Sequence, residues 1–168
     1  VDGVESQTAL ARTQQACDGV DQRGFAGAVG ADHRNDLARI DIVTKLFAAW
    51  SSGDVDAPQQ YMTDDAILWD SVGGLKEGWP AIREYFGHGL ERYPDLDLVP
   101  TGEWWARPDG LALQWTMSAT VIDDSMGPRH LGKKWSVPGL SFVVFEGDKV
   151  KAEYDYHDKG ARQRSLEA

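Results

Sequence analysis

Hydrophobic residues first fall into a regular pattern at residue 37, where they recur every three or four positions. They are Leu37, Ile40, Val43, Leu46, Phe47 and Trp50. This spacing puts them on one face of a helix, and the preceding Asp36 is suited to cap its first turn. The sequence therefore predicts a helix over 37–50.

Two more helices are predicted further along the chain. Asp56 as N-cap and Pro58 in the first turn start a short helix that ends near residue 62. The next helix spans 80–93, and its apolar residues form one stripe. That stripe consists of Ile82, Tyr85, Phe86 and Leu90.

Alternation of apolar and polar residues indicates strands in the remainder of the chain. A short hairpin is predicted over 66–77, and a long one joins 97–107 to 111–122 through Asp109-Gly110. Two more strands, 135–145 and 150–157, follow a polar loop. Three helices before a long antiparallel meander predict an α+β fold, in which a curved antiparallel sheet wraps around the helices as an open cone.

The first 35 residues show no comparable pattern. Five glycines interrupt them, and only 8–17 could hold a short helix. We therefore divide the chain into an appendage, 1–35, that is partly helical or mobile, and a domain, 36–168.

The composition of the chain excludes several classes of protein. With 168 residues and a net charge of −10, the chain is expected to be one globular domain that does not bind nucleic acid. A single cysteine, Cys17, excludes an internal disulfide and a cysteine-based zinc site. No apolar run reaches the roughly 18–20 residues needed to span a membrane, and no leader pattern precedes the domain. A cytoplasmic protein without a membrane partner is expected.

The seven tryptophans suggest both a cavity and an interface. Adjacent Trp104 and Trp105 must point to opposite faces of a strand, so one of them is expected to be exposed. Aromatic residues on a sheet face of a small domain are frequent at dimer interfaces, which favours a homodimer.

No motif indicates a cofactor or a metal ion. The paired acids at 64–65 and 123–124 lack the spacing of a calcium loop, and no histidine-rich zinc triad is present. Phosphate-binding glycine loops and nucleophile elbows are also missing from the sequence. We therefore expect chemistry without a cofactor.

Four segments carry a resemblance to a known superfamily: FAAWSSGD at 47–54, YMTDDAILWD at 61–70, GWPAIREYF at 78–86 and FEGDKVKAEYDYHD at 145–158. In order and spacing they resemble the nuclear transport factor 2-like superfamily, especially its SnoaL-like polyketide cyclase, ketosteroid isomerase and limonene-epoxide hydrolase branches. The resemblance covers about 37–165 and implies a cystatin-like α+β barrel. Because this superfamily includes both enzymes and non-catalytic proteins, function must be argued from the site.

Asp70 is the first candidate catalytic residue. It ends the first short strand, where the resemblance to ketosteroid isomerases implies a general base. Apolar neighbours such as Trp69 and Val72 are expected to raise the pKa of its carboxyl group. The alternative is a solvated residue before a glycine-rich turn.

Asp155 is the second candidate. On the last strand Asp155 and His157 share a face with Lys151 and Glu153. If this face points inward, Asp155 falls where the resemblance implies a catalytic carboxylate of the cyclases and epoxide hydrolases, and His157 is a potential acid partner. Otherwise the charged face is simply solvated.

The sequence also departs from each branch. Leu46 and Ser141 stand where the isomerases carry an oxyanion-binding Tyr and Asp, and Glu153 stands where the cyclases carry His. Thr116 and Ser118 replace the Arg-x-Asp of the epoxide hydrolases. His130 lies in a basic cluster, 128–134, that either attracts an anionic substrate group or is a solvated loop.

The leading hypothesis is a cofactor-independent acid–base enzyme of the isomerase, dehydratase or cyclase type. Its substrate would be a small apolar molecule, with polycyclic and polyketide-like compounds as candidates, and Asp70, Asp155 and His157 would move its protons. Residues expected to bind or orient this substrate are Tyr61, Trp69, Trp115, Thr116 and Ser141. The alternatives are an epoxide hydrolase of the limonene-epoxide type and a non-catalytic ligand-binding or dimerisation module.

Overall fold

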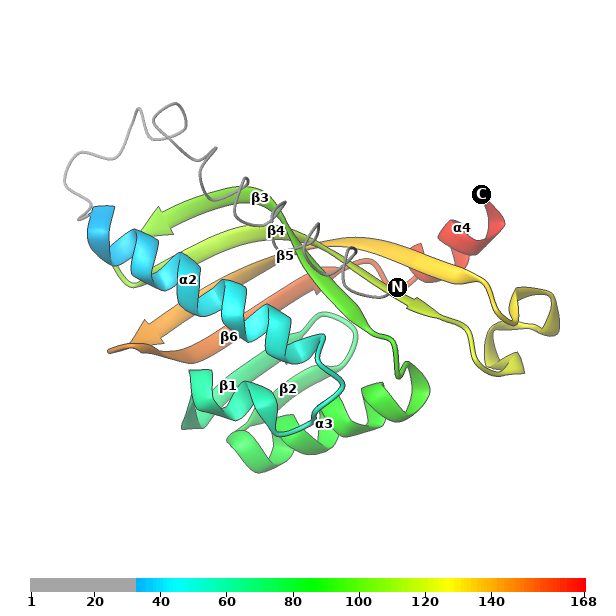
Figure 1. Cartoon of the computed structure of the whole chain (residues 1–168), viewed down its shortest axis with the longest axis horizontal. Helices are drawn as coiled ribbons and strands as arrows, with labels where there is room; N and C mark the ends of the chain where they lie inside the picture. The colour runs from blue at the N-terminus through cyan, green and yellow to red at the C-terminus, as the bar shows by residue number, and fades with distance from the viewer. Residues whose placement is uncertain (1–32) are drawn as a thin grey trace, which may run out of the picture. The chain divides into compact units, whose positions relative to one another are not determined.

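The computed structural model describes residues 33–168 (Figure 1). The predicted appendage therefore lies outside the described residues, except for 33–35. The elements in chain order are α2 (His33–Trp50), η1 (Ala57–Tyr61), β1 (Met62–Asp70), β2 (Gly74–Glu77), α3 (Trp79–Arg92), β3 (Asp97–Arg107), β4 (Gly110–Thr120), η2 (Asp124–Met126), η3 (Pro128–His130), β5 (Lys134–Glu146), β6 (Lys149–His157) and α4 (Ala161–Glu167).

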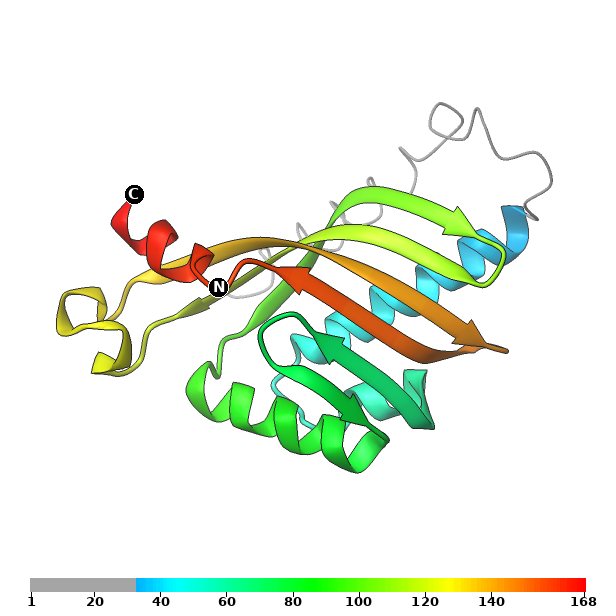
Figure 2. The ribbon, with the colours of Figure 1, turned by 180° about the vertical axis from the view of Figure 1, so that it is seen from behind.

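The six strands form one curved sheet in the order β2-β1-β6-β5-β4-β3 (Figure 2). Neighbouring strands are antiparallel, except that β1 lies parallel to β6. The predicted α+β fold is confirmed, and the expectation of a purely antiparallel sheet is corrected to a mixed one. The parallel pair arises because β1, far upstream in sequence, inserts between its hairpin partner β2 and the last strand.

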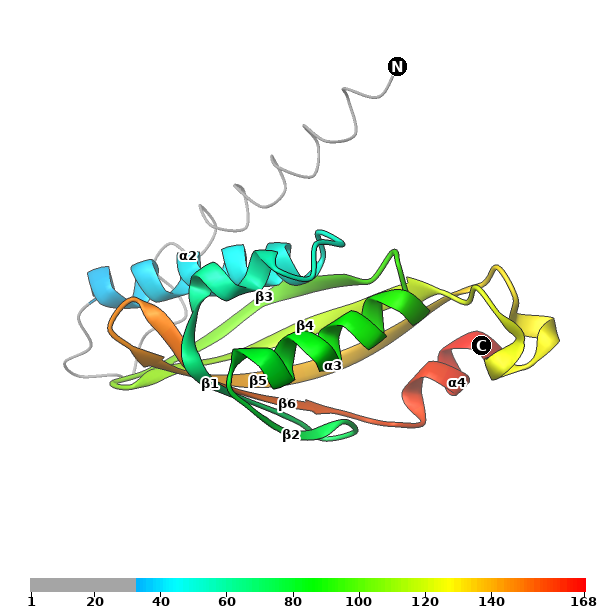
Figure 3. The same cartoon turned by 90° about the horizontal axis from the view of Figure 1, so that it is seen from below.

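Helices α2 and α3 cover one face of this sheet, which Figure 3 shows from below. Their apolar residues pack with those of the strands in one core, since Val43, Phe47 and Ile82 contact the same cluster as Leu113 and Val143. The alternation along each strand thus separates a helix-covered face from a second face that no helix of residues 33–168 covers, called here the helix-free face. The face on which each candidate residue lies decides whether its side chain can reach the others.

A second, smaller core lies at the start of β5, around its first residues. Leu166 of the short helix α4 packs there with Tyr93, Trp135 and Val137. The rings of Tyr93 and Trp135 meet edge to face, with their centroids 5.1 Å apart. Helix α4 was not predicted, because its seven residues carry too few apolar positions to show a period.

Several element boundaries differ from the sequence expectation. Helix α2 begins at His33, so Asp36 lies inside its first turn and is buried rather than capping the helix. Asp56 occupies the N-cap position of η1 but makes no capping hydrogen bond, because its carboxylate instead accepts two hydrogen bonds from Arg83, of 2.5 and 3.0 Å. No helix within 33–168 is long and apolar enough to cross a membrane.

Candidate active site

The strand register brings both candidate carboxylates together. Asp70 at the end of β1 is the pairing partner of Asp155 on β6, and Asp155 is in turn paired with Ser141 on β5. These residues share the helix-covered face with Glu153, which is 1% exposed. The acidic face of β6 therefore points inward, and the solvated alternative does not apply.

Asp70 and His157 form a buried pair. Their side chains are 12% and 4% exposed, and His157 Nε2 lies 3.1 Å from Asp70 Oδ2. Asp70 Oδ1 also accepts the backbone N–H groups of Val72 and Gly73, each at 2.6 Å. The turn between β1 and β2 is thus folded around this carboxylate.

These donors correct the expected pKa of Asp70. Burial acts to raise the pKa of its carboxyl group, as expected from the sequence, but the hydrogen bonds from His157, Gly73 and Val72 outweigh it and leave the pKa below its ordinary value. Asp70 is therefore ionised at neutral pH. It suits the role of an orienting anion better than that of a base that gains and loses a proton.

Asp155 has the opposite electrostatics. Burial raises the pKa of its carboxyl group to about 7; the hydrogen bond from Ser141 opposes the rise, and the negative charge of Asp70 adds to it. Ser141 Oγ donates to Asp155 Oδ1, while Trp115 Nε1 donates to Ser141 Oγ at 2.7 Å. Within the described residues, Asp155 Oδ2 accepts no hydrogen bond from a protein donor.

The Trp115 ring fits across β5 because residue 139 is glycine. A Cβ at Gly139 would overlap the six-membered part of the ring. In this position the Trp115 ring centroid is 6.0 Å from that of His157. Trp115 therefore contributes an aromatic ring and a hydrogen-bond donor to the same cluster.

Two further residues belong to the cluster and were not predicted. Both carboxylate oxygens of Glu153 are buried without a hydrogen bond of standard geometry in the described chain. Burial and the charge of Asp155 raise the pKa of Glu153 well above its ordinary value, against an opposing effect of Trp50. The sequence signal was available, since Glu153 lies two residues before Asp155 on one strand face.

Tyr85 of α3 is the other addition. Its hydroxyl lies directly against Gly73, where a Cβ would overlap it. Burial and the charges of Asp70 and Asp155 raise the pKa of its phenol, so it stays protonated and can donate a hydrogen bond. In the sequence Tyr85 is the only hydroxyl in the apolar stripe of its helix.

The remaining predicted binding residues are not brought to the cluster. Trp69 and Thr116 neighbour Asp70 and Trp115 in sequence, so alternation puts them on the helix-free face. The Trp69 ring contacts Tyr156 there, with centroids 4.9 Å apart. Tyr61 ends η1 and packs against the main core.

The helix-free face carries the aromatic residues that suggested a homodimer. Trp105 and Tyr156 are 47% and 44% exposed, whereas Trp104 packs against the main core. The predicted opposite orientation of the two adjacent tryptophans is therefore confirmed, and the homodimer stays a prediction.

His130 is also not a surface residue. It is 2% exposed, and its Nε2 accepts a hydrogen bond of 2.9 Å from Arg129 Nε. Within residues 33–168 no group of three His, Cys, Asp or Glu side chains is arranged to hold a metal ion.

Comparisons with known proteins agree with this architecture. A family model described as the SnoaL-like domain matches residues 43–153. No curated protein matches the sequence. Among solved structures, IdmH of Streptomyces antibioticus, a candidate polyketide cyclase, is 14% identical with a TM-score of 0.69 over 77% of this chain and 99% of its own.

Two other solved structures show the same fold. A candidate polyketide cyclase of Xanthomonas campestris is 15% identical, with a TM-score of 0.68 over 79% of this chain and 98% of its own. A hypothetical protein of Catenulispora acidiphila with a ketosteroid isomerase-like fold, in complex with trimethylamine, is 16% identical, with a TM-score of 0.65 over 76% of this chain and 92% of its own.

Proposed function

The chain belongs to the SnoaL-like domain family, and from its paired acidic groups we propose that it is a cofactor-independent acid–base enzyme of the isomerase, dehydratase or cyclase type. The observation that carries the proposal is the juxtaposition of Asp70–His157 with Ser141–Asp155 on neighbouring strands. A small, largely apolar molecule is the proposed substrate, with polycyclic and polyketide-like compounds as candidates.

Asp155 is proposed to remove and return a proton at a carbon beside a carbonyl group. A pKa of about 7 leaves both its protonated and ionised forms populated at neutral pH. A group poised near the working pH is the most effective general acid or base. Ser141 fixes the carboxyl orientation through one oxygen, so the other oxygen is the one that exchanges the proton.

His157 is proposed as the second proton carrier. Because ionised Asp70 accepts the hydrogen bond from Nε2, the proton of the neutral ring is on that nitrogen and Nδ1 carries the lone pair. Nδ1 is buried without a partner in the described chain. Tyr85, held in its protonated form, is suited to donate a hydrogen bond to the oxygen that becomes negative as the proton leaves carbon.

The proposal can be tested by proton exchange without knowing the natural substrate. Fused-ring ketones such as 2-tetralone are incubated in D₂O, and exchange beside the carbonyl is followed by proton NMR. We expect wild-type protein to catalyse exchange, with a rate that rises with pH through about 7 as Asp155 ionises. In the Asp155→Asn variant the exchange rate should no longer rise with pH through this range.

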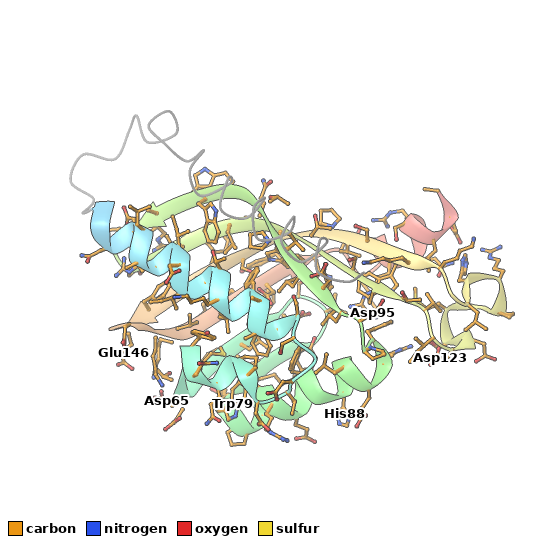
Figure 4. All side chains as sticks on the ribbon, in the orientation of Figure 1. Asp65, Trp79, His88, Asp95, Asp123 and Glu146 are labelled. Carbon is orange, nitrogen blue, oxygen red and sulfur yellow. The ribbon has the colours of Figure 1, made fainter. Side chains whose placement is uncertain are left out.

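A matched control uses Asp95, which is labelled in Figure 4. Its carboxylate accepts hydrogen bonds from the backbone N–H and hydroxyl of Thr120, of 2.9 and 2.6 Å. Asp95→Asn should keep the wild-type rate. Absence of exchange across the ketone panel, together with tight binding of the same ketones, would instead favour a non-catalytic binding module.

Epoxide hydrolysis receives no support from the site. Thr116, which stands at a position where the epoxide hydrolases carry Arg, lies on the helix-free face. The homodimer and the cytoplasmic location stay predictions from the sequence.

A further inference from the structure

Arg162, in the first turn of α4, holds its guanidinium group over two aromatic rings. Its Cζ lies 4.7 Å from the centroid of Trp135 and 5.2 Å from that of Tyr93. Contacts of this kind stabilise a cation by the negative face of the ring. They also orient the planar guanidinium group without using its N–H donors.

No carboxylate within the described residues forms an ion pair with Arg162, in contrast to two other arginines nearby. Arg164, two positions further along α4, pairs with Asp158, and Arg129 pairs with Glu167. Arg162 is also half-buried. It is thus a partly desolvated cation whose donors remain available in a strongly acidic chain.

Arg162 interacts electrostatically with Tyr85, a residue of the proposed active site. Its positive charge acts on Tyr85, lowering the phenol pKa against the larger effects of burial and of the charges of Asp70 and Asp155. Tyr85 is therefore within electrostatic range both of Arg162 and of the two carboxylates. In addition, Trp135 shares the helix-covered face of β5 with Ser141.

Helix α4 holds Arg162 in a defined position. Leu166 is buried in the second core, and Ser165 Oγ accepts the backbone N–H of Ser136 at 3.1 Å. Arg164 and Asp158 join the helix to the end of β6. The guanidinium group is therefore prepared for a ligand, since little side-chain order has to be gained on binding.

We propose that Arg162 binds an acidic group of the substrate, a carboxylate or an ionised enol, through the paired N–H donors of its guanidinium group. The inference rests on the proposed function, because it names the class of substrate that the same site accepts. Repulsion from ionised Asp70 keeps this acidic group away from the proton-transfer cluster. The substrate is therefore an elongated apolar molecule with its anion at one end and its reacting carbonyl at the other.

The test compares two ligands that differ only in charge. Naphthalene-1-carboxylate and naphthalene-1-carboxamide are titrated into the protein by isothermal titration calorimetry. Wild-type protein should bind the carboxylate about 10-fold more tightly, as expected for a charge-assisted hydrogen-bonded pair. Arg162→Met, which keeps an apolar side chain over the rings, should lose this preference.

Two further variants separate charge recognition from folding. Lys159→Met removes an exposed cation just before the same helix and should keep the preference, whereas Arg162→Lys keeps the charge without the guanidinium fork and should retain part of it. Circular dichroism and thermal unfolding establish that each variant is folded. Wild-type protein that binds the carboxylate no better than the amide, or an Arg162→Met variant that keeps the preference, would overturn the proposal.

This experiment and the exchange experiment fail independently. Binding is measured without turnover, so a lost preference in Arg162→Met stands even if Asp155→Asn still catalyses exchange, and then only the catalytic proposal fails. In the converse case, exchange depends on Asp155 while the preference for the carboxylate does not depend on Arg162. That combination of results would refute only the anion site.

Discussion

The pKa of Asp155 makes folding stability depend on pH in a specific direction. In the unfolded chain its carboxyl group titrates near its ordinary value of 3.8, whereas in the folded protein the pKa is about 7. Between these values the folded protein binds one more proton than the unfolded chain. The free energy of unfolding must therefore fall as the pH rises, until Asp155 is ionised in both states.

The size of the effect follows from the same values. Each pH unit over which the folded protein holds the extra proton corresponds to about 1.4 kcal/mol. Between pH 5 and pH 8, Asp155 should therefore lower the free energy of unfolding by about 3 kcal/mol. Asp155→Asn, which is neutral throughout, should remove this part of the pH dependence.

Urea unfolding followed by tryptophan fluorescence measures the difference. The free energy of unfolding is determined at pH 5 and pH 8 for wild-type protein, Asp155→Asn and the control Asp95→Asn. The pKa of Asp95 is lowered by its bonds to Thr120, so it is ionised over the whole range and its variant should show the wild-type dependence.

An equal loss of stability between pH 5 and pH 8 in wild-type protein and Asp155→Asn would refute the reasoning. Glu153→Gln provides a second measurement, because burial and the charge of Asp155 raise the pKa of Glu153, so that this group too binds a proton more tightly in the folded protein. Combining both substitutions should give the flattest dependence.

Two other predictions concern packing and the Asp70 pair. Gly139→Ala should lower the free energy of unfolding by about 1–3 kcal/mol, because its methyl group overlaps the Trp115 ring; Gly89→Ala, a control with open space around the added methyl, should not destabilise the protein in thermal unfolding. Asp70→Asn should cost about 1–3 kcal/mol at pH 7, because His157 and two backbone N–H groups lose a charged acceptor. Since the folded pKa of Asp70 is lowered, this deficit should shrink as the pH falls below 3.8, and a deficit that is equal at pH 7 and pH 3 would contradict it.

The alternation of residues along the strands was enough to predict most members of the cluster of acidic residues. Period-two alternation determines that Asp155, His157 and Glu153 share one face, and the core then decides which face is buried. The same rule could have excluded Trp69 and Thr116, because adjacent residues of a strand cannot both face the cluster. The prediction that both residues bind substrate beside Asp70 and Trp115 therefore conflicts with the alternation of the strands.

Other features of the site depend on contacts between distant segments. The parallel pairing of β1 with β6 has no local sequence signal, yet it brings Asp70 beside Asp155. The lowered pKa of Asp70 depends on backbone N–H groups oriented by the β1–β2 turn, which composition does not reveal. For this reason the two carboxylates could be selected from sequence, but which of them carries the exchangeable proton could not.

Pairing the first strand with the last also affects synthesis of the chain. Asp70 and His157 are separated by 87 positions, so a nascent polypeptide exposes the β1–β2 hairpin long before its imidazole partner leaves the ribosome. During that interval the edge of β1 that later receives β6 has no neighbour, and such unpaired edges promote association between chains. Completion of the candidate site therefore has to wait until the chain has been synthesised through β6.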